Sequence, residues 1–546
     1  MISIKMKHYY CIVVLFLIAY CTVFANSNLL DLDVMEVRNI VTAREMVTEH
    51  NWLIPTMNGE IRIAKPPLPT WLTALPLIFG KSDDNLGALR IPSGIASCVL
   101  MLFVYFFVAE LSDDLTVPFI CAAVLISSEF FIVMSKRASW DIFCHTFMLG
   151  AIWLFFRGWK IRESSPYIYL FAGILMGLSF LSKGPVSFHS MLLPFLLSYL
   201  YIFGKETFLQ QWKGNLFAVF ICLVISSAWP LYLYIFVPDA FVHVEATELR
   251  SWVDVIKKPV WYYISFPIHA GIWVCLVISA ILYRLFRNKS CSFSCSKNYN
   301  FLLLWIFWTV LLLTIVPKKS THYLFPVIVP LSILVGFCVK YLIKIFSEKR
   351  DTIADKWIIT IHGVIVFTVA IACSAFFIYD FIQTKQALFF QKSVAIVIFS
   401  FIGFLSLYFL KKRKIIGLMS CTVVLVCVVC LVIPQVVAQR VHHRSFMILK
   451  ESRAEIEGKN IAIYSSYEMD IKEIWAVGQR VKKIDPAELV SLPKPLALYT
   501  QDPPEKVLQN SPVSIKSVNY YVDKRSSKTD KIWYLSILDK AVAVSQ

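Results

Sequence analysis

The feature that most constrains this chain is a series of long apolar segments that recurs along most of its length. Each segment has roughly the 17 to 25 mainly apolar residues that a helix needs to cross a bilayer. Runs of this length indicate transmembrane helices. We predict about thirteen crossings, at about residues 9–25, 93–110, 116–134, 141–157, 166–182, 184–203, 215–236, 265–283, 301–316, 323–339, 357–379, 388–410 and 415–434.

The composition supports the same class of protein. Of the 546 residues, 58% are hydrophobic, and the formal net charge is +17. In a soluble protein this charge would suggest nucleic acid, but in a membrane protein it is typical of cytoplasmic loops that face anionic lipid. We therefore expect a polytopic α-helical membrane protein that contacts membrane lipid and binds no nucleic acid.

The basic residues also predict the orientation of the chain. They gather in alternate loops, and such loops lie in the cytoplasm by the positive-inside rule. Residues 1–26 fit either a first transmembrane helix or a signal peptide with a cleavage site near Ala25, and either reading places the next loop outside the cytoplasm. The basic loop residues are Arg157, Lys160, Arg162, Lys205, Lys213, Arg284, Arg287, Lys289, Lys297, Lys340, Lys344, Lys349, Arg350, Lys356 and Lys411 to Lys414.

These patterns predict two domains. Residues 1–435 form the transmembrane domain, in which 26–92 are the first external loop, and 436–546 form a soluble extracytoplasmic domain. In that tail, four β-rich runs surround a possible helix at 470–477, which predicts a small α/β domain with a capping or acceptor-binding role. The four runs are residues 460–464, 496–499, 514–518 and 532–537.

The first external loop concentrates charged residues between Met35 and Trp71. Its first part has the pattern of an amphipathic helix, which by itself is equally consistent with a solvated helix on the membrane surface. Its second part differs, because Asn58-Gly59 predicts a turn and Lys65-Pro66-Pro67 fixes an extended backbone that points one lysine in a set direction. We interpret this stretch as the active-site loop.

Four more polar segments fall on the predicted outer side, and with the first loop they could enclose one site at the membrane face. They are residues 135–141, 182–185, 237–264 and 317–323.

In their order, these segments resemble bacterial glycosyltransferases that use lipid-phosphate-linked sugars. The first loop reads acid-x-Arg, Arg-Glu-Met, Asn-Trp-x-x-Pro-x-x-Asn-Gly and Lys-Pro-Pro-Leu-x-x-Trp-Leu. Later matches are Asp141, Leu181 to Pro185, Pro259 to Tyr263, and a run that includes His322, Tyr323, Pro326 and Pro330. The chain is similar over residues 30–345 to the aminoarabinose lipid A transferases, which are related to protein O-mannosyltransferases and have the C-type membrane glycosyltransferase fold.

The resemblance implies which residues form the site. The family's acidic pair is matched by Met35-Glu36, which leaves Glu36 or Asp33 as the catalytic carboxylate, with Asp141 as a further catalytic acid. Ala64 stands where the family often has a glutamate linked with a metal, so we expect no metal and no cofactor. The implied substrate-binding residues are Arg38, Lys65, Arg137, Lys183, Glu245, Glu248, Lys318, Lys319, His322 and Tyr323.

For Asp141 a structural role is as reasonable as a functional one, and for Lys183 or Lys318 taken alone a structural role is the favoured interpretation. Lys183 and Lys318 lie near span ends, where a lysine can extend its ammonium group to the interface. Asp141 opens a predicted helix, where a negative charge interacts well with the helix dipole.

The function implied is transfer of a sugar from a polyprenyl-phosphate donor to a lipid A, glycan or protein acceptor, outside the bacterial inner membrane. Fixed cations would stabilise the phosphate that leaves, and a carboxylate would serve the acceptor or the sugar. The alternative is a transporter or flippase of lipid-linked sugars. A coupled transporter usually needs ionisable residues deep in its spans, and the acidic residue found inside a predicted span, Glu129, lies toward its end.

Overall fold

The computed structural model describes residues 2–161, 165–242, 258–286, 296–384, 389–442, 448–459, 461–508, 514–523 and 531–539. Its internal contacts divide the chain into two compact units. The bundle unit consists of Met1–Leu30, Ala64–Pro69 and Arg90–Pro434. The loop–tail unit consists of Asp31–Ile63, Thr70–Leu89 and Gln435–Gln546.

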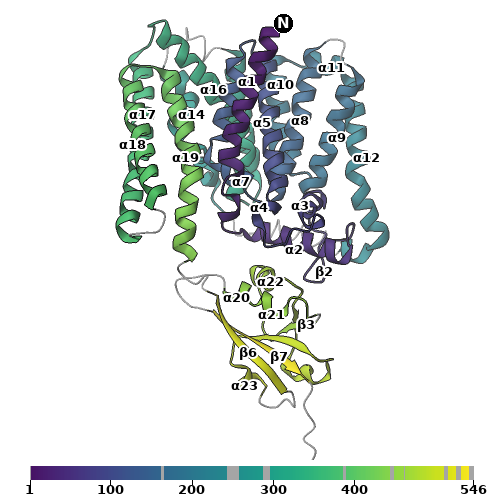
Figure 1. Ribbon diagram of the computed structural model, residues 1–546. Coiled ribbons are helices and arrows are strands. Elements are labelled where there is room, and N and C mark those ends of the chain that lie inside the picture. Colours follow the sequence, from purple (N-terminus) through teal and green to yellow (C-terminus); the bar gives the residue numbers. More distant parts are fainter. Residues whose placement is uncertain are drawn as a thin grey trace, which may run out of the picture. The chain divides into compact units, whose positions relative to one another are not determined.

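The bundle unit is built from long apolar helices (Figure 1). The α-helices are α1 (Ile2–Ala19), α5 (Ile91–Leu111), α6 (Thr116–Ile126), α7 (Glu129–Ser135), α8 (Trp140–Lys160), α9 (Pro166–Lys183), α10 (Leu193–Phe203), α11 (Glu206–Gln210), α12 (Trp212–Phe236), α14 (Val274–Phe286), α15 (Lys297–Ile315), α16 (Phe325–Ser347), α17 (Ile353–Thr384), α18 (Phe389–Lys411) and most of α19 (Ile415–His442). The π- and 3-10 segments are η1 (Tyr20–Phe24), η2 (Ser27–Leu29), η3 (Phe188–Leu192), η4 (Val260–Trp273) and η5 (Thr321–Leu324).

Within the described residues, 11 helices are long and apolar enough to cross a membrane, or up to 12 if a bent pair counts as one span. The predicted class, a polytopic α-helical membrane protein, is therefore confirmed, and the count of thirteen was approximate. Two of the thirteen predicted crossings differ from single straight spans. One is the pair α6 and α7, which is bent by 67° at a short break, and the other is the shorter apolar helix Phe188–Phe203.

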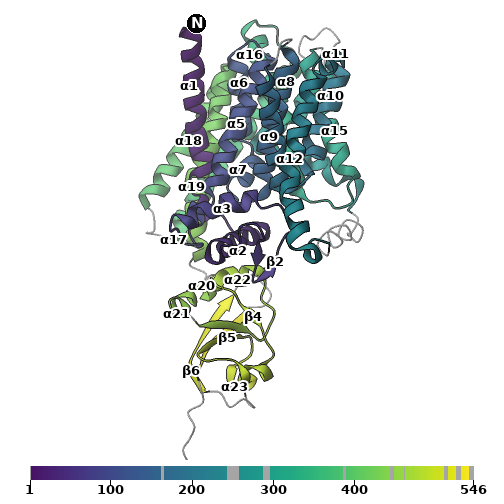
Figure 2. The same ribbon diagram turned by 90° about the vertical axis from the view of Figure 1, so that its right-hand side faces the viewer.

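Helices α8, α9 and α12 pack as close neighbours (Figure 2). Close approach of α9 and α12 depends on two glycines four residues apart on α9. A Cβ added at Gly173 would lie 2.5 Å from the carbonyl oxygen of Ala218, and one at Gly177 would lie 2.7 Å from Ile225. Small residues at this spacing let two membrane helices approach closely.

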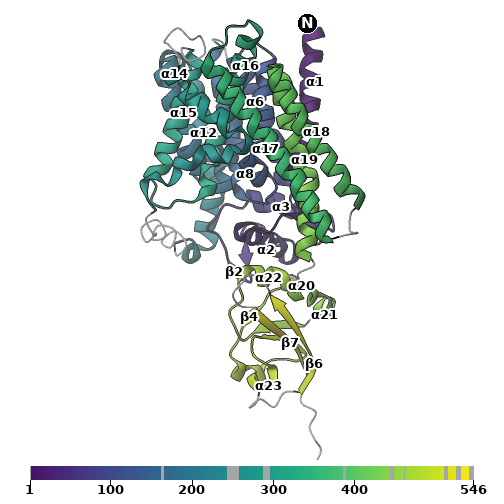
Figure 3. The ribbon, with the colours of Figure 1, turned by 90° about the vertical axis from the view of Figure 1, so that its left-hand side faces the viewer.

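Helices α17, α18 and α19 form another part of the same unit (Figure 3). The Nε2 atom of His362 on α17 lies 3.1 Å from the hydroxyl oxygen of Thr422 on α19. Asp380 of α17 forms a 2.7 Å ion pair with Lys392 of α18. Both members of that pair are almost completely buried. Because α17 continues past the predicted end of its span at residue 379, Glu129 does not stand alone as an acidic residue in a membrane helix.

The loop–tail unit contains a five-stranded sheet in the order β4-β3-β5-β7-β6. Strand β3 pairs in parallel with β4 and β5, whereas β7 pairs antiparallel with β5 and β6. The four predicted strands and the predicted helix are all present, and the two-residue strand β4 was not predicted. The elements are α2 (Val34–Glu49), β1 (Thr56–Met57), β2 (Glu60–Ile61), most of α3 (Leu68–Ile78), α4 (Leu86–Leu89), α20 (Ile448–Glu451), α21 (Arg453–Ile456), β3 (Ala462–Ser465), α22 (Ile471–Val477), β4 (Lys482–Lys483), η6 (Pro486–Ser491), β5 (Leu496–Thr500), α23 (Pro504–Val507), β6 (Ser514–Asp523) and β7 (Lys531–Asp539).

The first loop and the tail share one hydrophobic core. The apolar face of α2 contributes Val37, Ile40 and Val41, and the tail contributes side chains such as Trp475 and Trp533. Helix α2 therefore lies directly beside α22 (Figures 2 and 3). Residues 26–92 were predicted to belong to the transmembrane domain, whereas the structure groups most of them with the tail because their apolar partners are there.

Candidate functional site

A buried ion pair joins Asp141 and Lys183 in the bundle unit. Asp141 lies in the first turn of α8 and Lys183 is the last residue of α9, so the antiparallel packing of these helices brings the two side chains together. Their side chains are only 8% and 5% exposed, respectively. Each charge also has the sign that its helix end favours, and the pair is largely shielded from solvent.

Segment 320–323 completes this site. The Nζ atom of Lys183 lies 5.4 Å from the ring centroid of Tyr323, a distance at which a cation interacts with an aromatic face. Asp141 interacts electrostatically with His322, whose Nδ1 atom lies 2.9 Å from the Ser320 hydroxyl oxygen. The structure thus brings together four predicted residues that are far apart in the sequence: Asp141, Lys183, His322 and Tyr323. We call these four residues the Asp141 cluster.

The end of segment 258–263 packs beside the same segment. The backbone N–H of Ser320 donates to the Tyr263 hydroxyl at 3.2 Å, and the Tyr262 hydroxyl lies 3.2 Å from that of Thr321. Lys258 donates to the Tyr262 hydroxyl at 3.2 Å and also lies 4.4 Å from the centre of that ring. The Pro-x-Trp-Tyr-Tyr and His-Tyr segments, predicted separately, therefore form one aromatic wall.

His145 is a member of this neighbourhood that the sequence analysis missed. It lies one helical turn after Asp141, is 1% exposed, and interacts electrostatically with both Asp141 and Lys183. Among the described residues, its buried Nδ1 atom has no hydrogen-bond partner. The spacing of four residues on one helix is the sequence signal that could have identified it.

The neighbouring basic residues separate into different environments. Lys136 is 4% exposed and donates to the carbonyl oxygen of Ala25 at 2.6 Å, which ties α7 to the end of the first helix. Arg90, equally enclosed, donates to the carbonyl oxygens of Ser27 and Leu30. Arg137, the predicted substrate-binding residue, is half-buried next to Lys136. Lys136 and Arg90 therefore fix the bundle unit by backbone contacts.

The two candidate carboxylates of the first loop have different environments. Asp33 is the N-cap of α2, and its side chain accepts a hydrogen bond from the backbone N–H of Met35 at 2.9 Å. Glu36 lies in the first turn of the same helix and is fully buried, whereas Arg38 is exposed. Burial, followed by the nearby positive charge of Arg38, lowers the pKa of Arg62 to about 10. Two cations therefore lie near each other in this part of the loop–tail unit.

The remaining predicted residues are partly placed. Lys65, Lys318 and Lys319 are half-buried in the bundle unit, and the Nζ atom of Lys319 lies 3.5 Å from the carbonyl oxygen of Lys258. Glu245 and Glu248 lie outside the described residues.

Glu45, which was not predicted as a site residue, organises the turn of the first loop. Its carboxylate accepts hydrogen bonds from the Thr56 hydroxyl and from the backbone N–H groups of Asn58 and Gly59, at 2.7, 2.6 and 3.1 Å. Asn58 and Gly59 both have positive φ, as the turn of this two-residue hairpin requires. The predicted turn is confirmed, and Glu45 is the residue that holds it.

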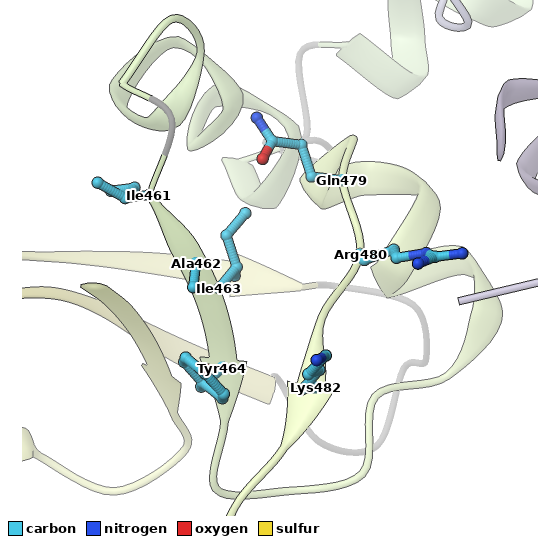
Figure 4. Close-up of a pocket in the computed structure, with 7 residues that line it drawn as sticks. All are labelled: Ile461, Ala462, Ile463, Tyr464, Gln479, Arg480 and Lys482. Carbon is cyan, nitrogen blue, oxygen red and sulfur yellow. The ribbon is translucent and has the colours of Figure 1, made fainter. Parts of the chain in front are cut away.

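A shallow cavity of about 210 Å³ also lies in the loop–tail unit (Figure 4). It is lined by Ile461 to Tyr464, Gln479, Arg480 and Lys482, and by none of the predicted site residues. Among the described residues, no three His, Cys, Asp or Glu side chains form a group that could hold a metal ion.

The chain is similar in sequence to a family of membrane glycosyltransferases and to named relatives. Residues 64–232 match the family described as dolichyl-phosphate-mannose-protein mannosyltransferase. An undecaprenyl phosphate-alpha-4-amino-4-deoxy-L-arabinose arabinosyl transferase of Pseudomonas fluorescens is 24% identical over 313 residues, which cover 55% of this chain and 51% of the relative. A protein described by the same enzyme name from Aeromonas hydrophila is 23% identical over 393 residues, which cover 68% and 67%.

A solved structure extends the similarity to the whole fold. The crystal structure of ArnT from Cupriavidus metallidurans bound to undecaprenyl phosphate matches with a TM-score of 0.69 at 15% identity, over 97% of this chain and 98% of that one. The chain is similar in sequence to aminoarabinose transferases and shares the fold of one of them. The predicted resemblance and fold class are thus confirmed, although the chain spans about half the length of the Pseudomonas relatives that it matches.

Proposed function

We propose that this multi-pass membrane protein is a glycosyltransferase that takes a sugar from a polyprenyl-phosphate donor. The observation that carries the proposal is the Asp141 cluster, in which the buried Asp141–Lys183 pair lies beside the half-buried side chains of His322 and Tyr323. Support also comes from the relatives, which are named as transferases of a sugar from undecaprenyl phosphate, and from the related structure, whose title names bound undecaprenyl phosphate.

The cations of the site would act on the phosphate of the donor. When the bond from the anomeric carbon to the phosphate oxygen breaks, its electron pair stays on the phosphate, and negative charge grows there. A lysine fixed where little water is present stabilises that charge more than a solvated lysine does. Lys183 has this environment, and we assign Lys65, Lys318, Lys319, Arg137 and Arg38 as further phosphate- or sugar-binding residues.

A carboxylate would act on the acceptor side. The new bond joins the anomeric carbon to an acceptor oxygen, and a hydroxyl acceptor must lose its proton to a base. Because the Asp33 side chain caps α2, Glu36 is the better candidate for this base. Asp141, held by Lys183 and flanked by His145 and His322, would orient the sugar or stabilise the positive charge that develops on it.

The proposal also covers the acceptor and the location of the reaction. We propose that the acceptor is lipid A, another surface glycan or a protein, reached from the extracytoplasmic side of the bacterial inner membrane. Glu245 and Glu248 belong to the loop that would meet the sugar or the acceptor.

The test combines an assay in detergent with mass spectrometry of cells. The full-length protein would be incubated with polyprenyl-phosphate sugars, including the aminoarabinose form, and release of polyprenyl phosphate would be measured. Lipid A and surface glycans of a deletion strain would be compared with those of the parent strain. We expect polyprenyl phosphate to be released only when an acceptor is present. We also expect the lipid A or surface glycans of the deletion strain to lack a sugar that the parent strain carries. If the protein in vesicles moved the intact lipid-linked sugar across the bilayer without release of polyprenyl phosphate, that result would instead favour a transporter.

A further inference from the structure

Helix α2, which carries Glu36 in its first turn, is held by residues from the far end of the chain. Its apolar face packs into a core that tail residues complete. The C-terminal part of α2 is held by Arg480. Arg480 precedes strand β4 and directs its guanidinium group away from the β3 side of the cavity (Figure 4). Two segments of the chain that are more than 400 residues apart in sequence therefore fold together within the loop–tail unit.

Arg480 bridges several groups at once. One of its terminal nitrogens donates to the carboxylates of Glu45 and Glu49 on α2 and to the hydroxyl of Thr56 in the hairpin. The contacts with Glu45 and Thr56 measure 3.3 and 3.2 Å. Since Glu45 also holds the Asn58-Gly59 turn, Arg480 contacts both the helix and the hairpin that follows it.

The next residue continues this attachment through the backbone. The Asn58 side chain donates to the carbonyl oxygen of Val481 at 2.8 Å and accepts from its N–H at 2.9 Å, so an amide side chain takes the place of a neighbouring strand. A second attachment lies at Asp83, which accepts from Arg44 of α2 at 3.0 Å and from Arg453 of α21 at 2.6 Å. Helix α2 is thus fixed to the tail at both its apolar and its polar face.

We propose that Arg480 is a positioning residue for the carboxylate on α2, and that the tail acts in the reaction by holding this helix. This inference rests on the proposed function, because it assigns the tail a role in the same site. Arg480 itself would touch no reacting atom. It keeps α2 and the hairpin at a fixed relation, so that Glu36 at the start of the helix keeps one orientation. A displacement of about 1 Å in a catalytic group can reduce a rate about 100-fold.

The first test is a kinetic cycle between Arg480→Ala and Glu36→Gln. We expect Arg480→Ala to lower kcat about 10- to 100-fold and to leave the KM for the donor within about twofold, because the proposed donor-binding cations other than Arg38 belong to the bundle unit. In the Glu36→Gln background, the same change should cause no further loss, because the group that it positions is already inactive. Lys483→Ala is the matched control, since Lys483 is an exposed cation of adjoining strand β4 that makes only a 3.9 Å ion pair with Glu468. We expect wild-type kinetics from it.

The second test measures hydrogen exchange of the full-length protein in detergent. Arg480→Ala should increase exchange of the amides in residues 34–49 and leave that of the bundle helices unchanged. Arg480→Lys should give an intermediate result, because a lysine supplies one point charge and not a planar group that reaches two carboxylates.

Three outcomes would overturn the proposal. They are normal kcat together with normal exchange in Arg480→Ala, an equal loss of activity in the Glu36→Gln background, or faster exchange throughout the protein. If the wild-type protein transferred no sugar, the proposed function would fail, and the exchange experiment would still decide whether Arg480 holds α2.

Discussion

Replacing Lys183 with Met would leave the buried carboxylate of Asp141 without its ammonium partner. The two side chains are 5% and 8% exposed, so water can do little to solvate the remaining charge. Removing one partner of a buried pair typically costs about 3 to 5 kcal/mol, which is two to three and a half powers of ten in the folding equilibrium. We expect Lys183→Met and Asp141→Asn each to lower the unfolding temperature in detergent clearly and to abolish most sugar transfer.

The double variant Asp141→Asn/Lys183→Met separates a structural from a chemical role. Neither charge remains buried alone in it, so most of the lost stability should return, as happens when buried ion pairs are replaced as a whole. Activity should not return if the pair binds the donor. We would measure the unfolding temperature by intrinsic fluorescence and release of polyprenyl phosphate at several donor concentrations, after checking that each variant reaches the membrane in normal amounts.

The Asp380–Lys392 pair supplies the matched control. It is an ion pair of the same charge type, 2.7 Å long and equally buried, in helices α17 and α18 of the same unit. The corresponding Asp380→Asn/Lys392→Met variant should keep most of its activity. Full activity in the stable Asp141→Asn/Lys183→Met variant would refute the reasoning and leave the pair with a structural role alone.

Three further predictions concern the first loop. Glu36→Gln should lower transfer about 10²-fold or more at normal expression, whereas Asp33→Asn should stay close to wild type because Asn caps a helix as well as Asp does; the opposite ranking in a turnover assay would make Asp33 the base. Lys65→Arg and Lys65→Ala should both transfer poorly at limiting donor, because a pocket fitted to a lysine accepts the larger planar guanidinium badly, and a Lys65→Arg variant with most of its activity would indicate a membrane anchor. Because Ala64 stands where the family often has a glutamate, turnover should persist in a chelator, and loss of activity that one divalent metal restores would contradict this.

The helices and strands could be predicted because their signals are local. A long apolar run has few alternatives to a membrane helix, and nearly every predicted crossing corresponds to a helix here. The amphipathic pattern after Asp33 likewise predicted α2, and Asn58-Gly59 predicted its turn. Strand β4 was missed because two residues, Lys482 and Lys483, carry no alternation that a sequence pattern can detect.

The site was predicted only in part, because its chemistry depends on contacts between distant residues. Asp141, Lys183, His322 and Tyr323 could be named from their order along the chain, but not the ion pair that two of them form. His145 carries no motif of its own, and its meaning comes only from the helix face that it shares with Asp141.

The resemblance in the first loop combines residues that serve two different purposes. Arg44-Glu45 and Asn58-Gly59 look like parts of a catalytic motif, yet Arg44 pairs with Asp83, Glu45 holds the turn, and Asn58 pairs with the backbone of the tail. For Glu36 and Lys65 we propose a chemical role instead. The motif therefore contains a few residues proposed for the chemistry, and a larger number that dock α2 and the hairpin on the rest of the loop–tail unit.

The residues that dock α2 on the tail matter because α2 would be only marginally stable alone. It has 16 residues, close to the length at which an isolated helix is marginal in water. Its core partners, such as Trp475 and Trp533, are synthesised more than 400 residues later. The first loop is therefore among the first segments outside the first helix to be made and among the last to complete its packing. If Glu36 is the base, as we propose, its carboxylate reaches its final position only when the tail has folded against α2, and the tail then acts before any acceptor binds.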